Sequence, residues 1–196
     1  MGVTAIILAG GKSSRFGKDK SLLMWNNQLI MQRLVSSCKV FAQEILIVSN
    51  QQNKFKIEGT KELSDIYPDM GPLGGLHTGL YAASCEKVFL TACDMPLMDA
   101  RLAEEMLEQL DTYEAVLPCC EGRFQPMFTV FQRRPALLAA EEMLQRGEQK
   151  MLLLLQRLHT KYIECSSDTE QAFFNMNYLQ DYHWLIHHYE CKKEEN

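Results

Sequence analysis

The sequence has no hydrophobic run long enough to cross a membrane. Its longest aliphatic run, Met151–Leu155, is far shorter than the roughly 18 apolar residues that a membrane-spanning helix needs. The N-terminus also lacks the basic and then apolar pattern of a secretory leader, because folded-type sequence begins at Val3. We therefore expect a cytoplasmic chain with no membrane partner.

The sequence has too little positive charge for a general nucleic-acid binder. Its 196 residues include 20 Lys and Arg against 25 Asp and Glu, which gives a net charge of −5 and a pI near 5.6. Proteins that bind nucleic-acid backbones need an excess of Lys and Arg. We therefore expect no nucleic-acid partner, and any anion site has to be local.

The sequence also lacks the cysteine spacing of a redox or zinc site. Its seven cysteines are an odd number and include no C-x-x-C pair. The adjacent Cys119 and Cys120 have no resolving cysteine at that spacing, so we interpret most of the cysteines as buried thiols in a reducing compartment. His183 and His187 have the i, i+4 spacing of metal ligands, but Trp184 stands where a zinc protease needs Glu.

What the sequence does contain is an alternation of buried strands and amphipathic helices. Short apolar runs that end abruptly at small or polar residues are typical of parallel strands covered on both faces. We predict such strands at residues 3–8, 44–48, 88–92 and 115–117, with helices at 29–35, 76–83 and 101–110. This order predicts an α/β fold with right-handed crossovers and a mostly parallel central sheet.

The second half of the chain departs from this rhythm. We predict an extended segment at 124–131, helices at 135–146, 150–158 and 179–188, a short strand at 162–165 and a charged tail at 191–196. No linker or repeat separates the two halves. We therefore predict one domain over residues 1–190.

A segment rich in glycine and basic residues follows the first predicted strand. Gly10 and Gly11 let the main chain approach a ligand closely and direct N–H groups at an anion. The spacing fits neither a P-loop nor G-x-G-x-x-G, so a solvated turn is the alternative to a polyphosphate site. The cations of this segment are Lys12, Arg15, Lys18 and Lys20.

Carboxylates and an amide follow other predicted strands, at the sheet edge where α/β proteins bind ligands. Asp94 could hold Mg²⁺ against substrate phosphates or merely begin a turn with Pro96. Asp65 precedes Gly71–Gly75, which we predict to break the chain and to let a base or ribose lie against the backbone. A plain surface carboxylate is the alternative for Asp65, and a capping role is the alternative for Asn50.

Several motifs occur in one order along the chain. The first is L-A-G-G-x-S-x-R-x-G-x-D-K over residues 8–20. The others are Gly71-Pro72-Leu73-x-Gly75, Cys93-Asp94-x-Pro96, Arg123-Phe124-Gln125-Pro126 and Phe174-Asn175-Met176-Asn177. This ordered set, from Val3 to about Tyr182, resembles the molybdenum cofactor guanylyltransferase family of nucleotidyltransferases. The first motif alone is shared with cytidylyl and sugar-phosphate relatives, and the chain departs from the family at Gly74 and at Tyr178-Leu179.

The resemblance implies both a fold and a reaction. The fold is Rossmann-like, with three α/β/α layers around a mostly parallel sheet. The reaction transfers GMP from GTP to the terminal phosphate of molybdenum-bound molybdopterin and releases pyrophosphate. Residues 1–118 would then bind the nucleotide and residues 119–190 the pterin, with transient contacts to other proteins of molybdenum cofactor biosynthesis.

The resemblance also implies site residues and a metal. The residues that it assigns to GTP are Leu8, Ala9, Gly10, Lys20, Asp65 and Asp94, with Asp94 also as the Mg²⁺ ligand. We add Gly11 and Arg15 to the triphosphate site, and we expect Arg15, Lys20 and Asp94 to be catalytic. The candidates on the pterin side are Arg123, Asn175 and Asn177. A cytidylyl- or sugar-phosphate nucleotidyltransferase and a non-catalytic nucleotide-binding module are the alternative functions.

Overall fold

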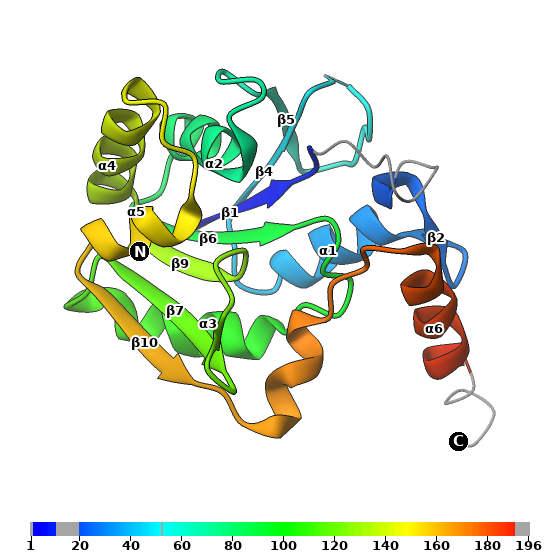
Figure 1. Cartoon of the computed structure of the whole chain (residues 1–196). Coiled ribbons are helices and arrows are strands. Elements are labelled where there is room, and N and C mark those ends of the chain that lie inside the picture. The colour runs from blue at the N-terminus through cyan, green and yellow to red at the C-terminus, as the bar shows by residue number, and fades with distance from the viewer. Residues whose placement is uncertain (1, 11–19, 52, 191–196) are drawn as a thin grey trace.

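An eight-stranded sheet forms the centre of the computed structural model, which describes residues 2–10, 20–51 and 53–190. Its strands are β1 (Val3–Leu8), β4 (Glu44–Ser49), β5 (Lys61–Ser64), β6 (Lys87–Ala92), β7 (Ala115–Cys120), β8 (Arg123–Phe124), β9 (Thr129–Gln132) and β10 (Thr160–Glu164). The strand order is β10-β7-β9-β6-β1-β4-β5, and β8 pairs with β7 (Figure 1).

The sheet is mostly parallel, as predicted. β1 runs parallel to both of its neighbours, with Ile6 opposite Leu46 of β4 and Leu90 of β6. β9 is antiparallel to β6 and to β7, which the extended pattern of residues 124–131 did not reveal. The sequence analysis missed β5, because this edge strand is polar and at least partly exposed along its whole length.

Helices cover both faces of the sheet and make the three predicted layers (Figure 1). One face carries α1 (Ile30–Cys38), α3 (Ala100–Glu108) and α6 (Leu179–Glu190), and the other carries α2 (Gly71–Ala82), α4 (Arg133–Gln145) and α5 (Met151–Arg157). Alternate side chains of β1 serve the two faces, with Ala5 and Ile7 in one buried cluster and Ile6 and Leu8 in the other. In the part of the chain that the structure describes, no helix combines the length and apolar character needed to span a membrane.

Shorter elements complete the chain. The 3₁₀ helices are η1 (Lys20–Leu22), η2 (Gln109–Asp111) and η3 (Ser167–Phe173). A small separate hairpin pairs β2 (Met24–Trp25) with β3 (Gln28–Leu29). Figure 1 shows α6 beside this hairpin, so the last helix of the chain lies against an early segment.

The segment Gly71–Gly75 is the first part of α2, and the prediction of a chain break there is wrong. Pro72 is tolerated in this first turn, where its missing N–H costs no helical hydrogen bond. The glycines allow α2 to lie close against β1: a Cβ at Gly79 would lie 2.6 Å from Cδ1 of Ile6, and one at Gly75 would lie 3.1 Å from Leu8. Close packing, rather than a loop, therefore explains Gly75 and Gly79, whereas Gly71 has a φ of 63°, which favours glycine.

Candidate active site

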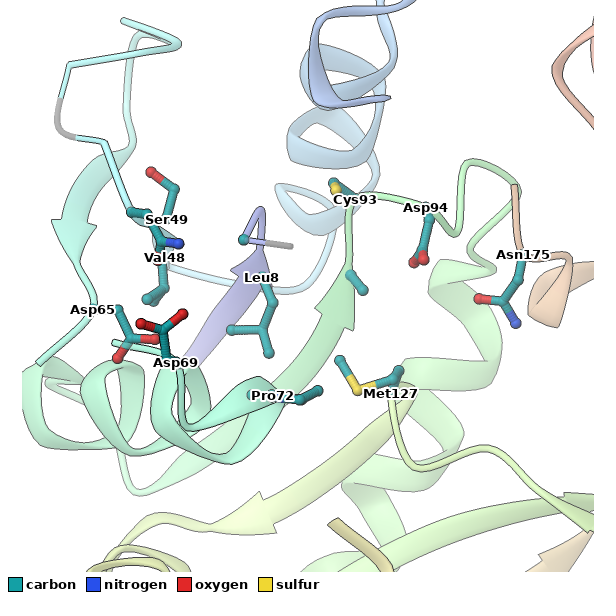
Figure 2. A pocket seen from close by; sticks show the side chains of 15 residues that line it. Leu8, Val48, Ser49, Asp65, Asp69, Pro72, Cys93, Asp94, Met127 and Asn175 are labelled. Carbon is teal, nitrogen blue, oxygen red and sulfur yellow. The ribbon is translucent and has the colours of Figure 1, made fainter. Parts of the chain in front are cut away.

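A cavity of about 520 Å³ lies at the carboxyl ends of β1, β4 and β6 (Figure 2). Parallel strands end at one edge of a sheet, so residues far apart in the sequence meet there. The lining residues that end or follow these three strands are Leu8, Gly10, Val48, Ser49, Asn50, Ala92, Cys93 and Asp94. The others are Asp65, Asp69, Gly71, Pro72, Gly75, Met127 and Asn175. In the view of Figure 2, Asp65 and Asp69 lie on one side of Leu8, and Asp94 and Asn175 lie on the other.

The Asp94 side of the cavity gathers polar groups from three distant segments. Nζ of Lys20, at the start of η1, donates a hydrogen bond to Oδ1 of Asn177 at 3.2 Å. The backbone N of Met176 donates to the backbone O of Asp94 at 2.8 Å, so the segment that carries Asn177 also rests on the loop after β6. The structure thus brings Lys20, Asp94 and Asn177 together.

Asp94 is a carboxylate in an unfavourable environment for its charge. Burial raises the pKa of the Asp94 carboxyl above its ordinary value. The nearby ammonium group of Lys20 and a hydrogen bond with the backbone of Asp94 itself lower this pKa, but they only partly offset the burial. An additional cation at this position would stabilise the ionised carboxylate.

The opposite side of the cavity is held by contacts within one stretch of chain. Oδ1 of Asp65 accepts a hydrogen bond from the backbone N of Tyr67 at 2.9 Å, and it shares the hydroxyl proton of Thr78, at 3.1 Å, with the backbone O of Gly74, also at 3.1 Å. Oγ1 of Thr78 in turn accepts from the backbone N of Ile66 at 2.9 Å. These bonds fix the Asp65 carboxylate between the end of β5 and the second turn of α2.

Asp69 lines the cavity and was missed by the sequence analysis. Its φ of 67° lies in the left-handed region, which Asp adopts more easily than most residues. The run Pro68-Asp69-Met70-Gly71 has the composition of a tight turn, and that signal could have drawn attention to it.

Other predicted site residues differ in where the structure places them. Ala9 lies between the lining residues Leu8 and Gly10 but is itself buried, with its backbone N bonded to the O of Val48. Arg123 is exposed and does not line the cavity, because its guanidinium faces Glu121 at 3.4 Å and Glu170 at 3.5 Å. Gly11 and Arg15 lie outside the described residues.

The fold is that of nucleotidyltransferases. The structure matches molybdopterin-guanine dinucleotide biosynthesis protein A of Archaeoglobus fulgidus with a TM-score of 0.80 at 19% identity, over 97% of this chain and 99% of that one. It also matches 4-diphosphocytidyl-2C-methyl-D-erythritol synthase of Anaerococcus prevotii with a TM-score of 0.76 at 12% identity, over 96% of this chain and 98% of that one. At such identities the likeness shows the fold alone, and the predicted fold class is confirmed.

Residues 5–161 match the MobA-like NTP transferase domain, and the chain belongs to this family. The molybdenum cofactor guanylyltransferase of Vibrio cholerae is 34% identical to this chain, over 90% of this chain and 87% of that protein. That of Vibrio atlanticus is 35% identical, over 88% of this chain and 89% of that protein. The resemblance seen in the ordered motifs is therefore confirmed, as is the enzyme class, a nucleotidyltransferase.

Proposed function

We propose that this enzyme transfers GMP from GTP to the terminal phosphate of molybdenum-bound molybdopterin and releases pyrophosphate. The observation that carries the proposal is that Asp94, which lines the cavity, lies near Lys20 and Asn177, two residues outside that lining. The names of the relatives at 34% and 35% identity support guanylyl transfer over cytidylyl or sugar-phosphate chemistry.

The uneven charge of the cavity suggests how GTP would lie in it. The triphosphate would lie toward Lys20, with the backbone N–H of Gly10 directed at its oxygens. The nucleoside would lie toward Asp65 and Asp69, whose carboxylates repel phosphate and accept hydrogen bonds from sugar hydroxyls or from a base. The roles of Gly11 and Arg15 at the triphosphate stay predictions from the sequence.

The reaction would be an in-line displacement at the α-phosphorus of GTP. A bond forms between an oxygen of the pterin phosphate and this phosphorus, while the bond to the bridging oxygen breaks and pyrophosphate leaves. A phosphate monoester is largely ionised near pH 7, so the attacking group needs no dedicated general base. The ammonium group of Lys20 would stabilise the charge that develops on the leaving pyrophosphate, so positioning and electrostatics supply the catalysis.

The residues at the Asp94 side fit the Mg²⁺ that the family implies. Mg²⁺ in nucleotide sites is held by one or two carboxylates together with substrate phosphates and water, which a single Asp94 satisfies. Among residues 2–10, 20–51 and 53–190 no cluster of three or more His, Cys, Asp or Glu could hold a metal by protein groups alone. Bound Mg²⁺ would neutralise phosphate charge, and Asp94 would be the group of this chain that holds it.

We place the pterin beyond Asn175, the residue that lines the cavity next to Asp94 in Figure 2. Nδ2 of Asn175 donates to the backbone O of Phe173 at 3.0 Å, which fixes the amide plane. Asn177 and the more remote Arg123 are further candidates on this side.

Transient contacts with other proteins of molybdenum cofactor biosynthesis would deliver and receive the pterin. The six cysteines among the described residues are all free thiols, which is consistent with a cytoplasmic location, where thiols stay reduced.

Release of pyrophosphate from GTP, measured with Mg²⁺ in the presence and absence of molybdenum-bound molybdopterin, tests this function. We expect release only when the pterin is present, and we expect CTP, UTP and dTTP to compete poorly with GTP. A preference for CTP would contradict the guanylyl assignment. Binding of GTP without any pyrophosphate release would instead indicate a non-catalytic nucleotide-binding protein.

A further inference from the structure

The first turn of α6 holds the backbone that carries Asn177. Oδ2 of Asp181 accepts hydrogen bonds from the backbone N of Asn177 and of Tyr178, both at 2.7 Å. This is one half of a capping box, in which the acidic side chain in the first turn reaches back to N–H groups before the helix. Because the acceptor is a carboxylate, these hydrogen bonds are stronger than those between neutral groups.

The same helix, α6, also makes a hydrogen bond and a ring contact with the segment that follows Lys20. The hydroxyl of Tyr182 donates to the backbone O of Met24 at 2.6 Å. Two helical turns after Tyr182, the ring of Tyr189 packs edge-on against Trp25, with ring centroids 5.6 Å apart. Figure 1 shows α6 and β2 beside each other. The helix therefore has fixed contacts both with Asn177 and with the chain just after Lys20.

The hydrogen bond between Lys20 and Asn177 joins the two segments that α6 contacts. A lysine side chain has four flexible methylene groups, so an ammonium group is poorly positioned unless an acceptor holds it. The neutral amide oxygen of Asn177 holds the ammonium group without cancelling its charge, which remains able to stabilise phosphate. The carboxylate of Asp181 accepts hydrogen bonds from backbone N–H groups, so it fixes the backbone of Asn177 and leaves the side-chain amide oxygen of Asn177 to accept from Lys20.

We infer that Asp181 is a positioning residue for the active site: it fixes the backbone of Asn177, and Asn177 in turn holds the Lys20 ammonium at the triphosphate side of the cavity. This inference rests on the proposed function of Lys20. A purely structural role would be that of an ordinary helix cap, whose loss lowers stability but leaves the active site unchanged.

A double-mutant cycle in the full chain separates the two roles. We expect Asp181→Ala and Asn177→Ala each to lower kcat/KM for guanylyl transfer about tenfold, and the double variant to lose about tenfold rather than about 100-fold. Asp181→Asn keeps an oxygen that can accept one of the two hydrogen bonds, and we expect it to retain activity within about threefold of the wild type. Additive losses would overturn the inference, as would unchanged kinetics in Asp181→Ala.

Glu44→Ala is the matched control for stability. Oε2 of Glu44 accepts hydrogen bonds from the backbone N of Ser84 at 2.8 Å and from the hydroxyls of Ser84 and Thr4, at the amino edge of the sheet. Its loss removes a carboxylate bound to backbone N–H at the edge opposite the cavity. We expect a lower melting temperature with normal kinetics. If Asp181→Ala loses activity only as much as Glu44→Ala at a similar melting temperature, the inference is wrong.

A second readout needs no turnover and so separates this inference from the proposed function. The rate at which acetic anhydride modifies Lys20, followed by mass spectrometry without nucleotide, reports how firmly the ammonium group is held. We expect Asp181→Ala and Asn177→Ala to speed this modification about twofold or more, and Glu44→Ala to leave it unchanged. An unchanged rate in Asp181→Ala would contradict the inference even in an active enzyme. A faster rate in a chain that releases no pyrophosphate would support the positioning of Lys20 by Asp181 and overturn the proposed function, so the two failures are distinguishable.

Discussion

The two ends of the cavity are assembled in different ways. Asp65 is held by Thr78, only 13 residues further along the chain, whereas the hydrogen bond from Lys20 to Asn177 joins residues 157 apart. The Asp65 end needs β4, β5 and α2, which all lie within residues 44–82, because the backbone N of Asp65 also donates to the O of Ser49. The Lys20 end needs segments from both terminal parts of the chain. The difference suggests that nucleoside binding and charge stabilisation depend on separate parts of the fold, and mutations at the two ends should separate KM from kcat.

The largest effect is expected from Asp94→Asn. Loss of the carboxylate that would hold Mg²⁺ should lower kcat on the order of 1,000-fold while the protein stays folded. Pyrophosphate release measured over a range of Mg²⁺ concentrations checks this. Asp111→Asn is the control. Asp111 is exposed, its Oδ1 lies 2.7 Å from Nζ of Lys87, and neither residue lines the cavity. Normal Mg²⁺-dependent turnover in Asp94→Asn would remove Asp94 from the mechanism.

Lys20→Ala should have the next largest effect. Removing one preorganised charge from the triphosphate side should lower guanylyl transfer at least ~100-fold. Steady-state turnover with GTP measures the loss, and Lys87→Ala is the control because Lys87 contacts Leu107 and Asp111 outside the cavity. Near-normal turnover in Lys20→Ala would reject its assignment to the triphosphate.

A smaller effect of a different kind is expected at the Asp65 end. Thr78→Val removes the hydroxyl that bonds Asp65, so the KM for GTP should rise about fivefold, equivalent to about 1 kcal/mol, with kcat within about twofold. Thr4→Val is the control, since Oγ1 of Thr4 donates to Glu44 at 2.6 Å at the far edge of the sheet. A drop in kcat with unchanged KM would show that the two ends are not separate.

The smallest expected effect concerns stability and pH. Burial raises the pKa of Asp94 in the folded chain, so the unfolded chain releases that proton at a lower pH. The free energy of unfolding therefore falls as the pH rises through this window, and a neutral Asn avoids the loss. Asp94→Asn should melt at a higher temperature than the wild type at pH 7, with the difference shrinking toward pH 3. Thermal unfolding followed by circular dichroism at several pH values measures both quantities.

Glu44 should show the opposite sign and so serves as the comparison for that measurement. Burial alone would raise its pKa, but hydrogen bonds from Ser84 and Thr4 and the charge of Lys61 lower it overall. The stability that the ionised Glu44 contributes is present at neutral pH and is lost as the pH falls through its folded pKa. Glu44→Gln should therefore lower the melting temperature at pH 7 and matter less in acid. The same sign for both variants would contradict these pKa directions.

The local sequence pattern predicted the buried parallel strands well. β1, β4 and β6 are mainly apolar runs, and their strand propensity agrees with their buried positions in the sheet. It failed at the start of α2, where glycine normally indicates a break but here allows the helix to approach β1. The polar edge strand β5 left no hydrophobic signal.

The candidate site was predictable where residues directly follow strands, as Asp94 and Gly10 do. Asp69 was not, because an exposed aspartate in a turn looks the same whether or not a cavity lies beside it. The contact between Lys20 and Asn177 depends on how α6 docks on β2, which no local pattern encodes. The division into a nucleotide half at 1–118 and a pterin half at 119–190 stays a prediction, although Asn177 from the second half bonds Lys20 of the first.

Protection of Lys20 by GTP tests the central claim most directly. Acetylation of Lys20 in the wild-type chain, followed by mass spectrometry, should slow about tenfold or more with saturating GTP and Mg²⁺, while Lys87 reacts at an unchanged rate. The protection should weaken in Asp94→Asn. If calorimetry shows GTP bound and Lys20 still reacts as in the free protein, the triphosphate does not lie between Lys20 and Asp94, and the account is contradicted.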